Sequence, residues 1–439
     1  MSSLKSVTKE GSFLVILQTV QTGSGSQAQE KNLEGTFASN ICIVGDGAEA
    51  IALAGLVSSN VAGQDAVAYI RLLGGVTPPH IELASAGLNS SMAPENADGT
   101  RKQAASRISS PVNIARYYPE NEIQYSLKSR DVEECLDHAN AVVISGPATA
   151  YSAIAKALAP YLTDGITIAI AGAPLLGAWQ FGQELKNFRP ELIVNLVELD
   201  WLFNHAQSSP DGVAVLGLRR RVNLSGRSRN EIRRALPLAC TLSPGLLPAS
   251  NMLERGFLDA ESVVRPVFIL SALLGSRIEA LGDLSTLLNR SNLAMLAEIE
   301  QEISRLSFSY KCALADFARA LREESYCQVN FEPQDIVDDE QCYEATLAEA
   351  LVGISGEWFK GLDWSHRMAQ EVLARYVSDH LVLLSDLARL ANVPTPVLDG
   401  VISISSALLG FDLRNRARGL NHLNLSGLSQ NELLELVNS

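Results

Sequence analysis

Short apolar runs and helical patterns alternate along the first half of the chain. The runs are rich in β-branched residues, as in strands that are buried on both faces of a sheet. Strands are predicted over residues 41–44, 66–73, 141–145 and 167–171, with helical patterns between them that include residues 150–161. Because strand and helix alternate to about residue 217, this half is predicted to be an α/β domain with a parallel sheet.

The second half has a different pattern, with long segments rich in Leu, Ala and Glu. Their apolar residues recur at spacings of three and four, which is typical of amphipathic helices. These segments span residues 229–236, 263–274, 293–324, 342–352, 366–376, 380–390 and 396–408. We therefore predict an almost entirely helical second half. Residues 1–39, which include a stretch rich in Gly, Ser and Gln, are predicted to be a flexible leader.

Charge and hydropathy exclude several classes of partner. The 439 residues carry 35 Lys and Arg against 49 Asp and Glu, and the net charge of -14 repels phosphate backbones and anionic lipid headgroups. No run approaches the roughly 18 consecutive apolar residues that a membrane span requires. We therefore expect neither nucleic acid nor a membrane among the partners.

Two features bear on location and on metals. The apolar run 13–20, which follows Lys5 and Lys9, resembles a secretory signal, although Glu10 and Gln18 weaken the likeness. The six cysteines form no CxxC pair and have no spacing with histidine that is typical of a metal site. We therefore expect buried thiols in a reducing cytoplasm, and no metal.

A glycine turn follows the first predicted strand and precedes a helical pattern. It consists of Gly45, Asp46, Gly47, Ala48, Glu49 and Ala50. Gly45 permits the tight turn, Gly47 lets the backbone approach a pyrophosphate, and Ala50 allows close contact between helix and strand. This context predicts a dinucleotide-binding domain. The carboxylates of Asp46 and Glu49 oppose a bound anion, and the alternative is that Glu49 only caps its helix.

The end of the second predicted strand bears on the choice between NAD and NADP. An acidic residue there would favour the ribose of NAD, whereas this chain has Arg71. A guanidinium suits the 2′-phosphate of NADP, so Arg71 favours NADP. The alternative is that Arg71 is a surface cation, and the cofactor is therefore predicted as NADP or NAD.

Several segments together resemble the opine dehydrogenases, the octopine and nopaline dehydrogenase family. Besides the glycine turn, they are residues 141–160, 216–222, 251–266, 375–379 and 393–409, and the resemblance covers residues 40–439. It implies a Rossmann domain over 40–221, an all-α substrate and dimerisation domain over 222–439, and an active site between them. Such enzymes use NADH or NADPH to reduce the imine formed from an amino acid and a 2-oxo acid.

One segment departs from the usual pattern of this family. Where residues 263–266 match, the family usually has a catalytic His before the Pro, and this chain has Arg265. A guanidinium keeps its proton throughout the working pH range, so Arg265 cannot be the base. The asparagines that usually precede this His are also replaced, by Leu258, Asp259 and Glu261.

A second departure lies in the helix that matches residues 375–380. This helix normally supplies an Arg for a substrate carboxylate and, five residues later, an Asp that orients the catalytic His. Arg375 is retained, whereas His380 occupies the Asp position. The resemblance implies that an Arg–His pair replaces the His–Asp pair, with His380 as the acid/base group and Arg265 lowering its pKa through like charge. The alternative is that both positions drifted after catalysis was lost.

Further candidates lie where the resemblance places the cleft. Pro147 is expected at the cofactor. Trp179 and Trp201 are candidates for shaping the substrate pocket, with core packing as the alternative. The arginine cluster 219–221 suits a carboxylate or phosphate, and equally a salt-bridged seam between domains.

Three functions stay open. The first is an opine-type reductase with an altered acid/base arrangement. The second is a non-catalytic relative that binds a ligand or a partner, and the third is a reductase of another small acid on the same scaffold. The expected partners are a small-molecule amino acid and a 2-oxo acid, and a homodimer is compatible with the sequence.

Overall fold

The computed structural model describes most of the chain from residue 139 onward and shorter stretches before it. The described residues are 40–45, 49–50, 52–53, 57, 67–73, 80–83, 108–109, 132–137, 139–209, 212–219, 221–243, 245–282, 286–313, 315–324, 347–351 and 364–438. The leader predicted over residues 1–39 lies outside them, as does most of the helical pattern 342–352, of which residues 347–351 are helical.

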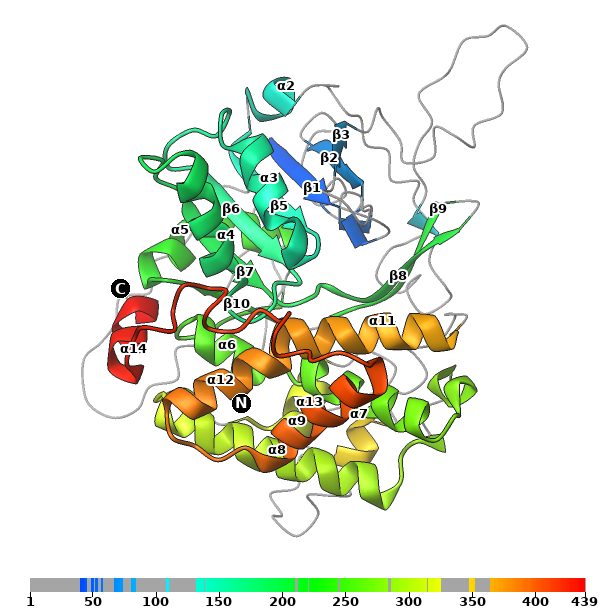
Figure 1. Ribbon diagram of the computed structural model, residues 1–439. Coiled ribbons are helices and arrows are strands. Elements are labelled where there is room, and N and C mark those ends of the chain that lie inside the picture. Colours follow the sequence, from blue (N-terminus) through cyan, green and yellow to red (C-terminus); the bar gives the residue numbers. More distant parts are fainter. Residues whose placement is uncertain are drawn as a thin grey trace, which may run out of the picture.

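An eight-stranded sheet dominates the first half of the molecule (Figure 1). Its order is β11-β10-β7-β6-β5-β1-β2-β3, and all neighbours are parallel except β2 with β3 and β7 with β10. The strands are β1 (Ile41–Gly45), β2 (Val67–Leu73), β3 (His80–Leu83), β5 (Ala141–Ser145), β6 (Thr167–Ala171), β7 (Asn195–Leu199), β10 (Val222–Gly226) and β11 (Leu246–Pro248). The four strands predicted from the sequence are confirmed.

Alternate residues of the central strands point into two separate cores. On one face, Val44 belongs to a core that includes α3 (Tyr151–Leu158) and α4 (Gly177–Phe188). On the other face, Ile43 belongs to a core with α5 (Arg229–Leu242). Helices cover both faces, so every residue of β1 is buried. The first core continues into the helical half.

A smaller sheet was not predicted from the sequence. Its order is β4 (Ile108–Ser109), β9 (Gly212–Leu218) and β8 (Phe203–Ser209), and β8 and β9 form an antiparallel hairpin. His205 lies within β8, opposite Leu216. The short helices of this half are α2 (Val132–Asp137) and η1 (Ala148–Ala150).

The second half is helical, as predicted. Its elements are α6 (Met252–Leu258), α7 (Glu261–Leu274), η2 (Ile278–Gly282), α8 (Arg290–Ser309), α9 (Phe317–Glu324), α11 (His366–Tyr376), η6 (Val377–Leu381), α12 (Val382–Leu390), α13 (Pro396–Leu409) and α14 (Gln430–Asn438). The pattern 293–324, predicted as one helical segment, is divided between α8 and α9. Lys311 between them has a φ of 57°, and a left-handed residue ends a helix.

Strand pairing extends the sheet beyond residue 221, where the sequence predicts the domain boundary. β10 pairs with β7, and β11 pairs with β10. Residues 222–248 therefore lie with the α/β half, although they follow the predicted boundary. We propose a boundary after Pro248, where the sheet ends.

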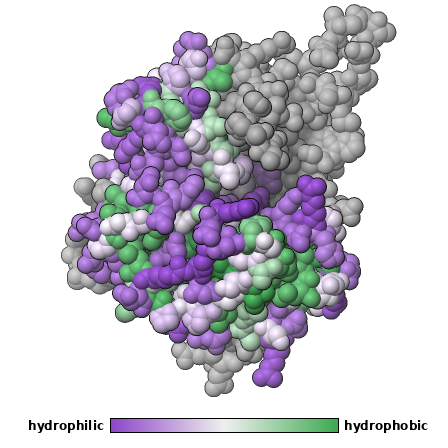
Figure 2. Space-filling view, viewed as in Figure 1, coloured by the Kyte–Doolittle hydropathy of each residue, from purple (hydrophilic) through white to green (hydrophobic). Residues whose placement is uncertain are grey.

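The two halves of the molecule differ in the hydropathy of their surfaces. On the side shown in Figure 2, the larger hydrophobic areas lie over the helical half, whereas the sheet half is mostly hydrophilic. Within the described part of the chain, no helix is long and apolar enough to cross a bilayer.

Candidate active site

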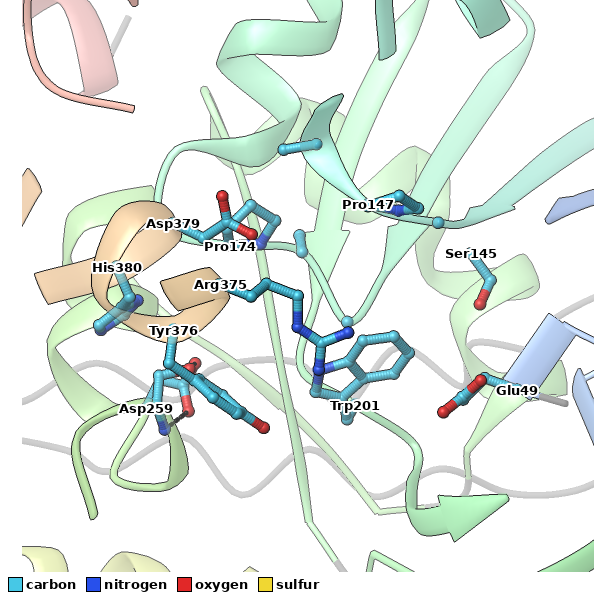
Figure 3. A pocket seen from close by; sticks show the side chains of 15 residues that line it. Glu49, Ser145, Pro147, Pro174, Trp201, Asp259, Arg375, Tyr376, Asp379 and His380 are labelled. Carbon is cyan, nitrogen blue, oxygen red and sulfur yellow. Dashed lines mark hydrogen bonds between the residues drawn. The ribbon is translucent and has the colours of Figure 1, made fainter. Parts of the chain in front are cut away.

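A cavity of about 270 Å³ lies where the carboxyl ends of the parallel strands face the helical half (Figure 3). Its wall on the sheet side includes Glu49, Ser145, Pro147, Gly172, Pro174 and Trp201. Its wall on the helical side consists of Asp259, Ser262, Arg375, Tyr376, Asp379 and His380. The cavity therefore brings together residues that are far apart in the sequence and differ in charge.

The sheet side of the cavity lies at the switch point of the strand order. β1 is flanked by β2 on one side and by β5 on the other. The strands that follow β1 directly in the sequence are therefore added on one side of it, and β5 and later strands on the opposite side. Gly45 is in register with Arg71 of β2 and with Ser145 of β5. Doubly wound sheets bind their ligands outside the carboxyl ends of the strands at such a point. The cavity is therefore where this fold places a dinucleotide.

Gly45 has no room for a side chain. A Cβ atom on it would lie 2.2 Å from the Cβ of Ala50 and 2.6 Å from the backbone oxygen of Ser145. The end of β1 thus lies close to Ala50 and to β5, and such close contact between helix and strand is what the glycine fingerprint requires. The backbone at the end of β1 fits a dinucleotide in this respect.

The structure gives the positions of some, but not all, of the other residues predicted to bind the cofactor. Glu49 and Pro147 line the cavity. Arg71 lies in β2, but its side chain is outside the described part of the structure. Asp46, Gly47 and Ala48 are also outside the described residues.

Trp201 forms the floor of the cavity against a glycine. Gly172 has a φ of +64°, and a Cβ atom on it would lie 2.3 Å from the indole ring of Trp201. Only glycine accepts both this conformation and this contact without strain. Trp201 therefore lines the cavity, whereas Trp179 packs beside the core and donates from Nε1 to the carbonyl of Leu423 at 3.2 Å.

Arg375 stands in the last turn of α11. Its side chain points into the cavity in Figure 3, toward Trp201. The guanidinium carbon lies 5.5 Å from the centre of the Tyr376 ring. Burial raises the pKa of the neighbouring Asp379 carboxyl, although Arg418 and Arg375 act in the opposite direction. The cavity thus presents one guanidinium close to a carboxyl group.

His380 is almost completely buried in the wall of the same cavity. It is 2% exposed, and within the described residues neither ring nitrogen makes a well-aligned hydrogen bond. Burial lowers the pKa of the imidazole to about 4, and Arg255 and Arg418 act in the same direction, whereas Asp259 and the backbone of Gly256 oppose the shift. The ring is therefore neutral at pH 7.

Asp259 supplies a carboxylate that acts on His380 from the same helical wall of the cavity. It connects α6 to α7 and accepts hydrogen bonds from the backbone nitrogen and the hydroxyl of Ser262, at 3.1 and 2.7 Å. Burial raises the pKa of Asp259, but His380, Arg219, Arg255 and the Ser262 bond outweigh it, and the pKa lies below its usual value. Asp259 is therefore ionised.

Arg265 has a partner other than His380. Its Nη2 lies 2.7 Å from Oε1 of Glu261, one helical turn earlier, and the side chain does not line the cavity. Arg219 also forms an ion pair with Glu261, and the hydroxyl of Tyr376 lies 3.5 Å from Oε1 of Glu261. The arginines that lower the pKa of His380 are Arg255 and Arg418. The predicted Arg265–His380 pair therefore gains no support from this geometry, and Arg219 lies in a salt-bridged seam.

A buried arginine behind the cavity connects the sheet to the helical half. Arg255 of α6 lies 2.8 Å from Oε1 of Glu198 and 2.9 Å from Oδ1 of Asp200, and donates to the carbonyl of Pro174 at 3.0 Å. Arg255 was not among the functional residues predicted from the sequence. Glu198 and Asp200 are two positions apart, so their side chains point to the same side of an extended chain. Two carboxylates on one side of a buried strand need a cation, and this spacing was the signal in the sequence that could have found Arg255.

Metal binding gains no support from the part of the chain that the structure describes. In these residues, no three His, Cys, Asp or Glu side chains are placed to hold a metal ion. The cavity still holds acidic, basic and titratable groups within reach of one small ligand. Such an arrangement can bind a carboxylate and exchange a proton with it or with a neighbouring group.

Comparisons with known proteins support the fold. No family model matches the chain. It is 24% identical over 318 residues to the opine dehydrogenase of Arthrobacter sp. (strain 1C), which covers 69% of this chain and 80% of that enzyme. A structure of octopine dehydrogenase with NADH and L-arginine aligns with a TM-score of 0.59 at 17% identity, over 90% of this chain and 97% of that chain.

A second solved structure gives the same result. Yersinopine dehydrogenase with NADP+ bound aligns with a TM-score of 0.57 at 15% identity, over 91% of this chain and 98% of that chain. The resemblance expected from the sequence is confirmed, and so is the fold class, an α/β Rossmann domain followed by an all-α domain.

Proposed function

Because the chain is similar to opine dehydrogenases in sequence and in fold, we propose that it is an NAD(P)H-dependent reductase of the opine type. It condenses an amino acid with a 2-oxo acid and reduces the resulting imine to a secondary amine. One observation carries the proposal, namely a single cavity that joins the switch point of the sheet to Arg375 and His380 of the helical half. A hydride donor and a substrate held from opposite walls meet in such a cavity.

The proposed cofactor is NADPH or NADH, held over the turn 45–50 with Pro147 beside it. When bound, its nicotinamide supplies the hydride that reduces the C=N bond. The octopine dehydrogenase structure with NADH and the yersinopine dehydrogenase structure with NADP+ support this cofactor class. Arg71, opposite Gly45 in the sheet, is the residue proposed to meet the 2′-phosphate of NADPH.

Arg375 is proposed to bind a substrate carboxylate. Its guanidinium is exposed and lines the cavity, and a planar fork suits bidentate pairing with a carboxylate. The Tyr376 ring beside it limits the directions in which the fork can turn. Arg375 therefore orients the substrate relative to His380, which lies five residues later.

His380 is proposed to move the proton. Because the ring is neutral at pH 7, it can accept a proton from the ammonium group of the donor and free the amine to attack the 2-oxo carbon. The attack leaves a proton on the nitrogen and an alkoxide on the carbon, and this proton passes to the alkoxide to give a hydroxyl. His380 then returns its own proton to the hydroxyl, which leaves as water when the iminium forms. His380 has thus recovered its starting state before the reduction.

The non-catalytic alternative is favoured by one observation. Arg265, at the position where the family usually has its catalytic His, is paired with Glu261. A reductase of another small acid is the third candidate, because the same scaffold serves several chemistries. A cytoplasmic location and a homodimer stay predictions.

Cofactor binding is the first test. Fluorescence titration of the full chain with NADPH and with NADH should show saturable binding, with NADPH preferred. Replacing Arg71 by Ala should remove that preference, because the 2′-phosphate loses its cation. Should neither cofactor bind at millimolar concentration while circular dichroism shows an intact fold, the enzyme proposal fails.

Product analysis is the second test. Pairs of amino acids and 2-oxo acids are incubated with reduced cofactor, and mass spectrometry detects the secondary amine. His380→Ala should reduce turnover by about 10²–10⁴-fold. Binding of cofactor without turnover of any pair would favour the non-catalytic alternative. Reduction of a 2-oxo acid without an amine would favour the third candidate.

A further inference from the structure

The helix that carries Arg375 and His380 contains a π-turn. α11 is followed directly by η6, in which the N–H of Val382 bonds to the carbonyl of Val377, five residues earlier. In a regular α-helix, residue i+5 is rotated by about 140° from residue i. In a π-turn, where the hydrogen bond runs from residue i to residue i+5, residue i+5 comes back toward the face of the helix on which residue i lies. The π-turn therefore lets Arg375 and His380 line one cavity.

A residue near the C-terminus satisfies the carbonyls of this turn. One added residue in a helical turn leaves a carbonyl without an intrahelical partner, and a buried carbonyl needs one. The carbonyl of Ser378 accepts from the backbone nitrogen of Arg418 at 3.0 Å. The carbonyl of Asp379 accepts from Nη1 of the same arginine at 2.8 Å. Arg418 thus completes the π-turn from outside the helix.

The same guanidinium is attached to the sheet half. Nη2 of Arg418 donates to the carbonyl of Leu175 at 3.1 Å, and Nε donates to Oε1 of Gln180 in α4. The side chain is buried, with 4% of the residue exposed. Its donors are therefore divided between the loop before α4, α4 itself and η6, which carries two of the residues that line the cavity.

From these contacts we propose that Arg418 is a positioning residue, which holds the π-turn against the sheet half and so keeps His380 at the cavity. The effect on catalysis rests on the proposed function, whereas the coupling of residue 418 to η6 does not. Lysine cannot replace it, because a compact ammonium lacks the fork that reaches three acceptors in different directions. The C-terminal segment thereby becomes part of the machinery of the site.

Hydrogen exchange of the full chain tests the coupling. Arg418→Lys and Arg418→Met should make the amides of η6 exchange roughly tenfold faster, because the turn loses charge-assisted bonds. Arg416→Lys and Arg416→Met are matched controls, since Arg416 belongs to the same segment but is exposed and stacks on the Phe411 ring at 4.8 Å. The controls should leave η6 exchange unchanged.

A milder variant covers the case in which Arg418 variants do not fold. Gln180→Leu removes one anchor and leaves the guanidinium in place, and it should accelerate η6 exchange in the same direction. If folded Arg418→Lys and Gln180→Leu proteins both exchange at the parental rate in η6, the inference is wrong.

Kinetics separate positioning from general stability. In Arg418→Lys, kcat should fall at least tenfold while KM for the reduced cofactor stays the same, because the hydrogen bonds of Arg418 reach η6 rather than the glycine turn. Added guanidinium ion should partly restore kcat in Arg418→Met. A parental kcat in a folded Arg418→Lys enzyme would overturn the positioning role. A parent without turnover would count against the proposed function, and the exchange result would still decide the coupling.

Discussion

The charged neighbour that was predicted for His380 and the one that the structure shows would shift its pKa in opposite directions. The sequence predicts Arg265, a like charge, whereas the structure places the carboxylate of Asp259 opposite the imidazole and pairs Arg265 with Glu261. Burial is the largest cause of the low pKa of His380, and Asp259 is the main group that opposes it. The effect of removing either neighbour can therefore distinguish the two arrangements.

Asp259→Asn should lower the pKa of His380 below its value of about 4, because the opposing carboxylate is lost. If neutral His380 is the base, activity falls as pH drops through this pKa, and the acidic limb of kcat/KM should move to lower pH. Arg265→Met should leave the limb in place, because Glu261 already holds that guanidinium. The measurement is a pH–rate profile of both variants. An unchanged limb in Asp259→Asn would contradict this account.

Arg375→Lys should weaken substrate binding although the charge is kept. A lost charge-assisted bond is worth roughly 1.5–3 kcal/mol, so KM for the carboxylate substrate should rise by about 10–100-fold with a smaller change in kcat. Arg367→Lys on the same helix is the matched control, since Arg367 is exposed and pairs only with Glu371 among the described residues. Steady-state kinetics give both values. Parental kinetics in Arg375→Lys would remove this residue from the site.

At the scale of elements, β7 and α6 are joined by charges rather than by apolar contact alone. Glu198 and Asp200 receive the guanidinium of Arg255, which is fully buried. Glu198 is further bonded by the backbone nitrogen of Ala178, and Asp200 by Asn223. Burial raises the pKa of Asp200 even though Arg255 acts against the shift. The cluster therefore depends on its cation.

Arg255→Met should lower the free energy of unfolding by about 3–5 kcal/mol, because two buried carboxylates lose their partner. Without this cation the pKa of the Asp200 carboxyl, already raised by burial, rises further in the folded state, so the loss should be smaller at pH 5 than at pH 8, where the folded protein must keep that carboxylate charged. Denaturant unfolding at both pH values measures this. Arg367→Met, which breaks an exposed pair, is the control and should leave the unfolding curve nearly unchanged. Equal losses at both pH values would contradict the argument.

At the scale of the whole molecule, the two halves share one core. The core on one face of the sheet includes Val44 and Ile144 and continues into Phe268 and Leu387 of the helical half. Arg418 adds polar bonds across the same seam. The halves are therefore coupled over apolar and polar contacts, although the sequence predicts them as separate domains.

Thermal unfolding should accordingly show a single transition for the ligand-free chain. Neither half can keep its side of the shared core buried after the other unfolds, and exposed apolar surface costs free energy. Differential scanning calorimetry, with circular dichroism and tryptophan fluorescence as separate probes, is the measurement. Two resolved transitions, or probes with different midpoints, would show that the halves unfold independently.

Local pattern was sufficient for the elements and for part of the site. The buried strands 141–145 and 167–171 and the helix 366–376 have the bounds that their hydrophobic periodicity predicts. Gly45 could be identified because a tight turn after a strand restricts the residue type. The strands, the helix and the glycine depend on neighbours along the chain, and the sequence displays them directly. Arg375 and His380, by contrast, were found through the resemblance of residues 375–380 to the opine dehydrogenases.

Only the tertiary structure decided which charges meet. Asp259 faces His380 across 121 positions of the sequence, and Arg418 reaches Gln180 across 238. The same holds for the pairing of β10 with β7, which carried the sheet past the predicted boundary. Periodicity tells which side of an element is buried, but a buried charge can be satisfied by many partners. Which partner it meets depends on how helices and strands pack, and a single sequence contains no local signal for that choice.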